Sequence, residues 1–244
     1  MTRILALHRS LLGKKVIVAV TGAMLLAFLL LHVAGNLKAF LPDPSPGIPD
    51  IDLYSHWLRS MGEPLLPSSF ALWAVRIVLL LALVLHVECV LQLAVRNRRA
   101  RPVRYDRVEH AEATASARWM LYTGALLLLF VVIHLLHFTT GSLDPDGFVR
   151  GAVYANLHHA FGRWPVVLFY LGALVVLTLH LSHGAWSLFQ SLGLDNPDRN
   201  RALRRTALAI AIAIPLGFAA VPLAFSTGLM KPPQSHVVSS GGAR

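Results

Sequence analysis

The chain has 244 residues, of which 55% are hydrophobic and only 14% are charged, and its mean hydropathy is +0.60. Because a soluble globular domain carries about 25% charged residues, this composition excludes a water-soluble enzyme and a disordered chain. The formal net charge of +10 would suggest nucleic-acid binding in a soluble protein, but here the basic residues lie between long apolar runs. The single cysteine, Cys89, lies inside one such run, which excludes a disulfide framework and a cysteine-ligated metal cluster within this chain.

Five apolar runs account for the low charge content, and they cover residues 16–37, 70–95, 119–140, 164–192 and 206–229. Each is longer than the roughly 20 residues that a helix needs to cross a bilayer, and four of the five contain no Asp, Glu, Lys or Arg. The first run is too long for the apolar region of a signal peptide, so we interpret it as a retained span. The sequence therefore predicts an all-α integral membrane protein with five transmembrane helices, organised as one domain over residues 1–230 with a short outer tail over 231–244.

Lys and Arg are distributed unequally between the two sides of the predicted helices. The segment before the first span and the loops after the second and fourth spans hold fifteen of them, whereas the other two loops and the tail hold six. Cytoplasmic loops are the basic ones, so we expect the N-terminus inside and the C-terminus outside. We interpret the basic runs as topology signals and anionic-lipid contacts rather than nucleic-acid sites, and docking of a soluble partner on the inner face is compatible with them. The outer loops 41–67 and 141–163 are rich in Pro, Gly and Asp and are predicted to form turns or short interfacial helices.

Six of the twelve histidines lie inside the predicted spans: His32, His86, His134, His137, His180 and His183. An ionisable residue in a span is costly and by default indicates function, although a single histidine is more often hydrogen-bonded to a neighbouring helix. Here four helices each contribute at least one imidazole, and no thiolate or carboxylate cluster accompanies them. This pattern favours haem with axial histidine ligands, bound by a bundle of the first four helices, over zinc or a proton relay.

The depth of the histidines, at about 1.5 Å of helix rise per residue, sorts four of them into two levels. His32 and His134 lie sixteen and fifteen residues along spans that run outward, which puts both toward the outside. His86 and His180 each lie sixteen residues along spans that run inward, which puts both toward the inside. The sequence therefore predicts two bis-histidine haems b stacked across the bilayer, bound non-covalently because the chain has no Cys-x-x-Cys-His.

Three glycines fit the same two levels. Gly22 and Gly124 lie ten residues before His32 and His134, near the inner level, and Gly172 lies near the outer level. A glycine removes the Cβ that would obstruct a porphyrin, but glycines also allow close helix packing in membranes. Both interpretations stay open.

Further polar residues in the spans each have two interpretations. His137 and His183 follow a first histidine by three residues and share its helix face, so either could replace it as ligand or flank a porphyrin edge or a quinone. Arg76 lies near the outer level, where it could pair with a haem propionate or extend to the interface. Glu88 could conduct protons or form an interhelical hydrogen bond.

Four local motifs resemble those of a known family. They are HRSLLG at residues 8–13, HVAGN at 32–36, HL at 134–135 and HLSHGAWS at 180–187. With them, the chain resembles the single-chain, five-helix, di-haem cytochrome b membrane anchor of succinate dehydrogenases and fumarate reductases, over residues 5–230. The resemblance implies a multi-pass protein of the prokaryotic cell (inner) membrane that takes part in the respiratory chain and the tricarboxylic acid cycle.

The resemblance also implies a mechanism. A flavoprotein oxidises succinate, an iron–sulfur protein relays the electrons, and the anchor passes them through its haems to a quinone, often menaquinone. FAD and iron–sulfur clusters then belong to these partners on the inner face, and this chain is a non-catalytic electron-transfer subunit without a succinate site. A further small anchor subunit or a higher oligomer stays open.

Within the family, the haem ligands correspond to His32, His86, His134 and His180. Arg9 resembles a quinone contact of related anchors. Some members place a proton-conducting glutamate two residues before the fourth-span ligand, and this chain has Thr178 there. The alternatives are a di-haem anchor of another dehydrogenase, of the formate dehydrogenase or hydrogenase type, and a haem-free membrane transporter.

Overall fold

The computed structural model describes residues 10–100 and 115–232, and in these ranges its regular elements are all helices. They are α2 (Leu11–Leu37), η1 (Lys38–Phe40), α3 (Asp50–Ser60), α4 (Phe70–Arg99), α5 (Ala115–His134), η2 (Leu135–Thr139), α6 (Val153–Phe161), α7 (Trp164–Ser191) and α8 (Asn200–Ser226). Five of these, α2, α4, α5, α7 and α8, are long and apolar enough to cross a membrane, with α5 continued by the π-helical turn η2. The predicted all-α fold with five transmembrane helices is confirmed.

The long helices extend beyond their apolar runs at one end of the molecule. α2 begins at Leu11 rather than residue 16, α4 ends at Arg99 rather than residue 95, and α8 begins at Asn200 rather than residue 206. Apolar runs mark only the part of a helix inside the hydrocarbon layer, whereas a helix continues until its backbone groups find other partners. For α2 that partner is Ser10, whose hydroxyl accepts a hydrogen bond from the Gly13 N–H at 2.9 Å.

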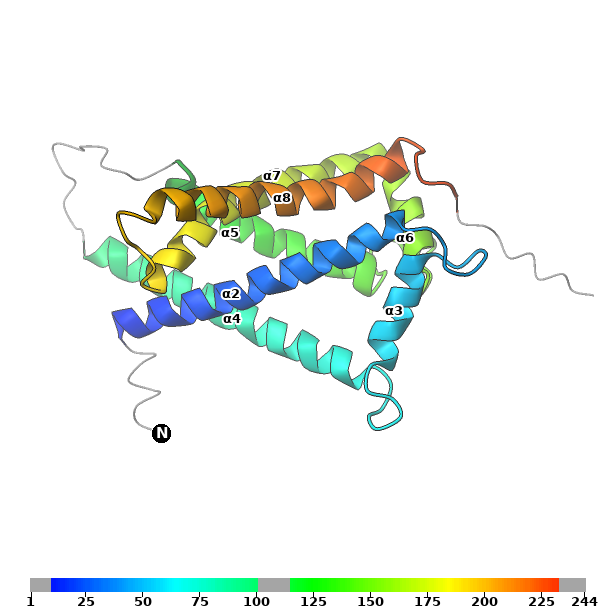
Figure 1. Ribbon diagram of the computed structural model, residues 1–244, viewed down its shortest axis with the longest axis horizontal. Coiled ribbons are helices and arrows are strands. Elements are labelled where there is room, and N and C mark those ends of the chain that lie inside the picture. The colour runs from blue at the N-terminus through cyan, green and yellow to red at the C-terminus, as the bar shows by residue number, and fades with distance from the viewer. Residues whose placement is uncertain (1–9, 101–114, 233–244) are drawn as a thin grey trace, which may run out of the picture.

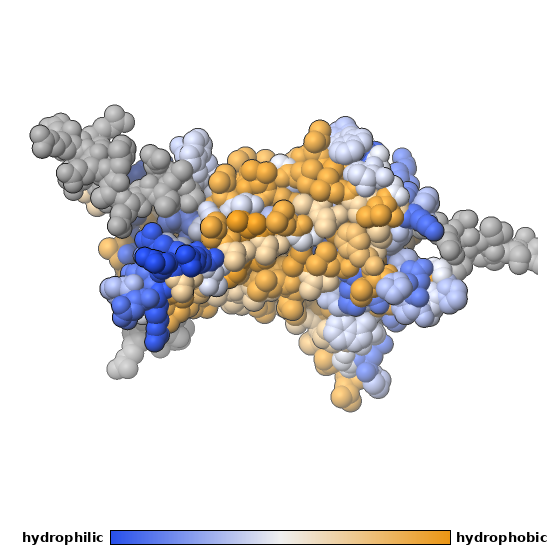
Figure 2. Space-filling view, turned by 45° about the horizontal axis from the view of Figure 1, so that its top comes forward, coloured by the Kyte–Doolittle hydropathy of each residue, from blue (hydrophilic) through white to orange (hydrophobic). Residues whose placement is uncertain are grey.

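Consecutive long helices run in opposite directions, and the described chain begins at one end of the bundle and finishes at the other (Figure 1). α2 packs against α4, α5 packs against α7, and α8 lies along α7 while also contacting α2. On the face shown in Figure 2, a broad hydrophobic band covers the middle of the molecule, and hydrophilic residues lie at both ends. This arrangement is that of a multi-pass membrane protein.

α8 carries no histidine, but it is the most enclosed of the five long helices. In its most apolar stretch 39% of the residues are buried, against 6–17% in the other four helices. It runs without interruption through Pro215 and Pro222, both of which are buried. A Cβ added at Gly217 would lie 2.7 Å from Cγ2 of Val33, so the close approach of α8 to α2 depends on glycine at this position.

Two short helices, α3 and α6, lie at the end of the bundle where α2 finishes (Figure 1). They confirm that the loops 41–67 and 141–163 contain short helices. Lys38 forms an ion pair with Asp50 at 2.8 Å, and the Asp52 carboxylate accepts a hydrogen bond from the Tyr154 N–H at 2.9 Å. Burial raises the pKa of the Asp52 carboxyl, although the bond from Tyr154 opposes this. α2 and α4 separate toward this end, where α3 leads from one to the other (Figure 1).

Charge is unequal between the two ends. We call the end where α2 and α8 begin the basic end. Nine Lys and Arg with described side chains lie there, with two Asp, Asp195 and Asp198: they are Lys14, Lys15, Arg96, Arg98, Arg99, Arg199, Arg201, Arg204 and Arg205. The opposite end has five Lys and Arg and six Asp and Glu among the described residues of its loops: Lys38, Arg59, Arg150, Arg163, Lys231, Asp43, Asp50, Asp52, Glu63, Asp144 and Asp146. The asymmetry on which the predicted orientation rests is thus a property of the folded molecule.

Candidate haem-binding site

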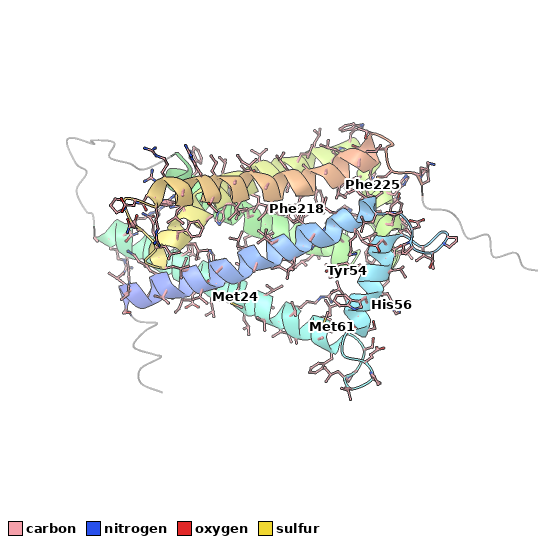
Figure 3. All side chains as sticks on the ribbon, in the orientation of Figure 1. Met24, Tyr54, His56, Met61, Phe218 and Phe225 are labelled. Carbon is pink, nitrogen blue, oxygen red and sulfur yellow. The ribbon has the colours of Figure 1, made fainter. Side chains whose placement is uncertain are left out.

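The structure brings His32 of α2 next to His134 of α5; we call them the outer pair. Their ring centroids lie 5.9 Å apart, and the ring planes are inclined at 78°. Aromatic rings surround both imidazoles: Phe28 and Phe218 on His32, at centroid distances of 5.2 and 5.5 Å, and Phe130, Phe138 and Tyr170 on His134, at 5.7, 5.8 and 6.1 Å. Phe218 reaches this site from α8, on the side of that helix that faces α2 (Figure 3).

The outer pair has the spacing that a shared metal ion requires. Two metal–imidazole bonds of about 2 Å each, together with two distances of about 1 Å from ring centre to nitrogen, give roughly 6 Å between ring centroids. The Nδ1 atom of His134 is buried and has no hydrogen-bond partner among the described residues. Since an unpaired buried polar atom is costly, the outer pair fits a ligand that would use its nitrogens.

His86 of α4 and His180 of α7, the inner pair, lie against polar side chains. The Nδ1 atom of His86 is 3.1 Å from the Thr21 hydroxyl of α2, and the Nδ1 atom of His180 is 3.2 Å from the Thr123 hydroxyl of α5. The two imidazoles are close enough to influence each other electrostatically. Four different helices therefore meet at the inner pair.

Gly22 and Gly124 lie beside the same two imidazoles. A Cβ added at either glycine would lie 3.4 Å from the Cε1 atom of His86 or of His180, respectively. This places both glycines at the level of the inner pair, as the helical rise predicts. Gly172 differs, because it is exposed and nothing lies within 4 Å of an added Cβ.

Thr21 and Thr123 were not singled out from the sequence. Each directly precedes one of the two glycines, and each lies eleven residues before a histidine of the outer pair. The repeated Thr-Gly dipeptide at the same distance from His32 and from His134 was the available signal. The sequence alone does not reveal the role of this dipeptide, because that role depends on the packing of His86 of α4 and His180 of α7 against it.

His137 is buried in the π-helical turn η2, and its Nδ1 atom is 3.0 Å from the Tyr170 hydroxyl. It also lines a small pocket with Asp144, Asn156 and His159. Asp144 accepts a hydrogen bond from Arg163 and lies 3.1 Å from His159. Partial burial acts to raise the pKa of the Asp144 carboxyl, but the hydrogen bond and positive charge of Arg163, with those of His159, bring it below its ordinary value.

The remaining predicted residues lie in varied surroundings. His183 is half-buried and interacts electrostatically with His180. Arg76 is exposed, and its guanidinium lies over the Trp73 ring, 5.1 Å from the centroid. Arg9 lies outside the described residues.

A polar seam between α2 and α4 at the basic end was also missed. Lys14 is only 2% exposed, and its ammonium group donates a hydrogen bond to the Gln92 side chain. The Gln92 amide in turn donates to Glu88 at 2.8 Å, so Glu88 takes part in hydrogen bonding along this seam. The free Cys89 is buried beside it.

Comparison with known protein families gives a match over residues 96–220, which is about half of the chain, to the family described as succinate dehydrogenase/fumarate reductase transmembrane subunit. The matched part runs from the last turn of α4 into α8, so it includes His134 and His180 but not His32 or His86. No curated protein and no solved structure matches the chain. The match agrees with the resemblance carried by the local motifs, rather than with an anchor of another dehydrogenase or a transporter. The chain therefore belongs to the family of succinate dehydrogenase/fumarate reductase transmembrane subunits.

Proposed function

We infer that the chain is a membrane subunit of an oxidoreductase complex and associates with the catalytic subunits of succinate dehydrogenase or fumarate reductase, because it belongs to this family. We propose that it is a di-haem cytochrome b anchor that passes electrons from the iron–sulfur subunit to a membrane quinone, menaquinone being the expected species. The observation that carries this proposal is the meeting of four histidines from four helices in two pairs, which lie at different levels along the bundle.

The ligand assignment follows from the two pairs. His32 and His134 would hold one haem, and His86 and His180 the other. When bound, haem b would supply one-electron transfer between the iron–sulfur subunit and quinone. His134 is preferred to His137, because its ring lies 5.9 Å from the ring of His32, whereas the Nδ1 atom of His137 already has the Tyr170 hydroxyl as partner.

His180 is preferred to His183 for a different reason. Its ring lies against Thr123 and Gly124 as the His86 ring lies against Thr21 and Gly22. Because the two rings have equivalent surroundings, His86 and His180 are proposed as the two ligands of the same haem. His183, like His137, would then lie beside a porphyrin edge or a quinone.

The other residues predicted to surround the haems are three glycines and two arginines. Gly22 and Gly124 would let the inner imidazoles approach α2 and α5 closely, and Gly172 would leave room beside α7. Arg76 would serve a propionate only if its side chain turned away from Trp73. Arg9 is kept as a quinone contact on the family resemblance alone.

We further propose that the flavoprotein and iron–sulfur subunits dock at the basic end, on the inner face of a prokaryotic cell membrane. The nine described Lys and Arg against two Asp at this end support that orientation. The N-terminus would then be inside and the C-terminus outside. Reporter fusions in the loop after α4 should give an inside signal, and an outside signal would reverse the assignment of the inner and outer pairs.

The experiment that tests the proposed function is isolation of the native complex followed by haem quantitation and an assay of succinate-dependent quinone reduction. We expect b-type haem, co-purifying flavin and iron–sulfur protein, and quinone reduction. The purified single chain should not oxidise succinate with a soluble dye. His56→Ala is the matched control for histidine substitutions, since His56 is exposed on α3 (Figure 3), a helix that contributes no residue to either pair.

A further inference from the structure

The hydroxyl groups of Thr21 and Thr123 already have acceptors within their own helices. The Thr21 hydroxyl lies 2.7 Å from the Ile17 carbonyl oxygen and 3.3 Å from that of Val18. The Thr123 hydroxyl lies 3.1 Å from each of the carbonyl oxygens of Trp119 and Met120. A hydroxyl has one proton to donate and two lone pairs that accept, so each threonine gives its proton to the helix and keeps a lone pair for the imidazole beside it.

That hydrogen-bond direction determines the state of the two imidazoles. A threonine oxygen that only accepts requires a donor at Nδ1, and this direction of the bond puts the proton of His86 and of His180 on Nδ1. At His86 the backbone carbonyl oxygen of Val18 is a further acceptor. In a neutral imidazole the other nitrogen, Nε2, is then unprotonated and has a lone pair available. The threonines also hold the rings in one orientation, because both hydroxyls are buried and fixed by the helix carbonyls.

We propose that Thr21 and Thr123 are positioning residues of the inner pair: they fix His86 and His180 in the Nδ1–H tautomer and leave Nε2 as the iron ligand. The proposal rests on the proposed function for the identity of the ligand. It goes beyond it in naming the two groups that select the tautomer. A hydrogen bond from a ligand's other N–H to an oxygen is the usual means of fixing a metal-binding histidine and of raising its basicity.

In the part of the chain that the structure describes, the outer pair has no equivalent of the threonine hydrogen bond at His134. The Nδ1 atom of His134 has no partner among the described residues, and aromatic rings surround it. The hydrogen bonds to threonine therefore belong to the inner pair, and their removal should affect the inner haem only. A more basic ligand favours the oxidised, more positively charged iron, so loss of the hydrogen bond should raise the midpoint potential of the inner haem.

The test uses Thr21→Val and Thr123→Val, which keep the branched shape and remove the hydroxyl, in the intact complex. We expect Thr123→Val to raise the midpoint potential of the inner haem by about 59 mV, which for a one-electron couple is about a tenfold change in the redox equilibrium and matches the low end of what such a hydrogen-bond partner contributes to metal affinity. Thr21→Val should raise it less, because the Val18 carbonyl oxygen remains as an acceptor for His86. The potential of the outer haem should not change. Thr21→Ser and Thr123→Ser should restore the original value, because serine keeps the accepting oxygen.

Thr178→Val is the matched control. Its hydroxyl also donates within its helix, to the Leu174 carbonyl oxygen at 2.9 Å, and it lies two residues before His180. This variant should leave both potentials unchanged. Equal shifts in Thr178→Val and Thr123→Val would mean that polarity in the helix, and not the hydrogen bond, sets the potential, and would overturn the proposal.

A second measurement makes the proposal independent of how well the valine variants assemble. Nitrogen-15 NMR of the full wild-type chain, labelled at histidine and prepared without haem, should show His86 and His180 protonated at Nδ1. Protonation at Nε2 would mean that the threonines donate to the rings, and would refute the proposal. Absence of haem from the native complex would instead refute the proposed function, while the NMR result still decides the tautomer.

Discussion

The inner and outer histidine pairs consist of the same residue type in opposite environments. The inner pair has a buried hydroxyl at each Nδ1, whereas the outer pair lies among five aromatic rings and includes a buried nitrogen with no partner among the described residues. The difference arises from the helices that enclose each pair. Ligand identity alone therefore does not define such a site, and the residues behind each ligand determine its tautomer and polarity.

The divergence of α2 and α4 accounts for this difference. At the basic end the two helices are close, and Thr21 on α2 reaches His86 on α4. Toward the other end they separate (Figure 1), and α8 packs against α2 there through Gly217 and Phe218. The outer pair is thus enclosed by α8, a helix without any histidine, which supplies an aromatic ring in place of a hydroxyl.

Replacing the ligands should have the largest effect and should separate the two pairs. His86→Ala and His180→Ala should each remove the same haem, and His32→Ala and His134→Ala should each remove the other, because one missing axial ligand disrupts a bis-histidine site. Haem content and low-temperature spectra of the purified complex measure this. If His183→Ala removed a haem while His180→Ala left both spectra intact, the ligand choice in α7 would be wrong.

A side chain at Gly217 should disturb the outer half of the bundle. Gly217→Val introduces a Cβ 2.7 Å from Val33, and overpacking of this kind costs typically about 1–3 kcal/mol. We expect a lower thermal midpoint of haem loss, with the outer haem lost first. Leu216→Ala, at the adjacent and exposed position of α8, should leave the midpoint unchanged, and a comparable decrease in this variant would contradict the role given to the α2–α8 contact.

Phe218→Ala should act on the outer pair alone and more mildly. Phe218 is half-buried beside His32, so the cost should be at most about 3 kcal/mol, the low end for a buried phenylalanine. The gap would admit lipid or water next to the His32 ring and shift the spectrum of the outer haem. The same shift in the signal of the inner haem would show that α8 does not distinguish the two pairs.

The ion pair at Asp144 should have the smallest effect. The pKa of this carboxyl lies below its ordinary value of 3.8 in the folded chain. Its contribution to stability is therefore present above pH 3.8 and is lost as the pH falls through the lower, folded-state pKa. Asp144→Asn should weaken the acid dependence of unfolding at the end of the bundle opposite the basic end, without changing haem content. An unchanged acid dependence would mean that the Arg163–Asp144 pair contributes little, as exposed pairs often do.

The fold was predictable because hydrophobicity over twenty or more residues is a strong signal, and the short helices α3 and α6 lie in loops where short outer helices were expected. The levels of the histidines followed from helix rise alone, and the contacts of Gly22 and Gly124 agree with them. Phe218 and the two threonines were not predictable in the same way. Their roles depend on which helices are neighbours and which faces meet, and the periodicity of one helix carries no information on either.

The sequence-based prediction also placed the helix termini at the basic end incorrectly. Arg96, Arg98 and Arg99 follow the apolar run that ends at residue 95, yet α4 continues to Arg99. Arginines tolerate a helical backbone well and reach water from the last turns. Hydropathy marks where the bilayer ends, and the helix does not have to end with it.

The measurement that tests the central claim most directly is the number of haems per chain in the native complex. We expect two moles of b-type haem per mole of this chain, by pyridine haemochrome quantitation against a quantified amount of the chain. A single haem would mean that only one of the two histidine pairs binds iron. No haem in an intact, active complex would contradict the proposed di-haem anchor.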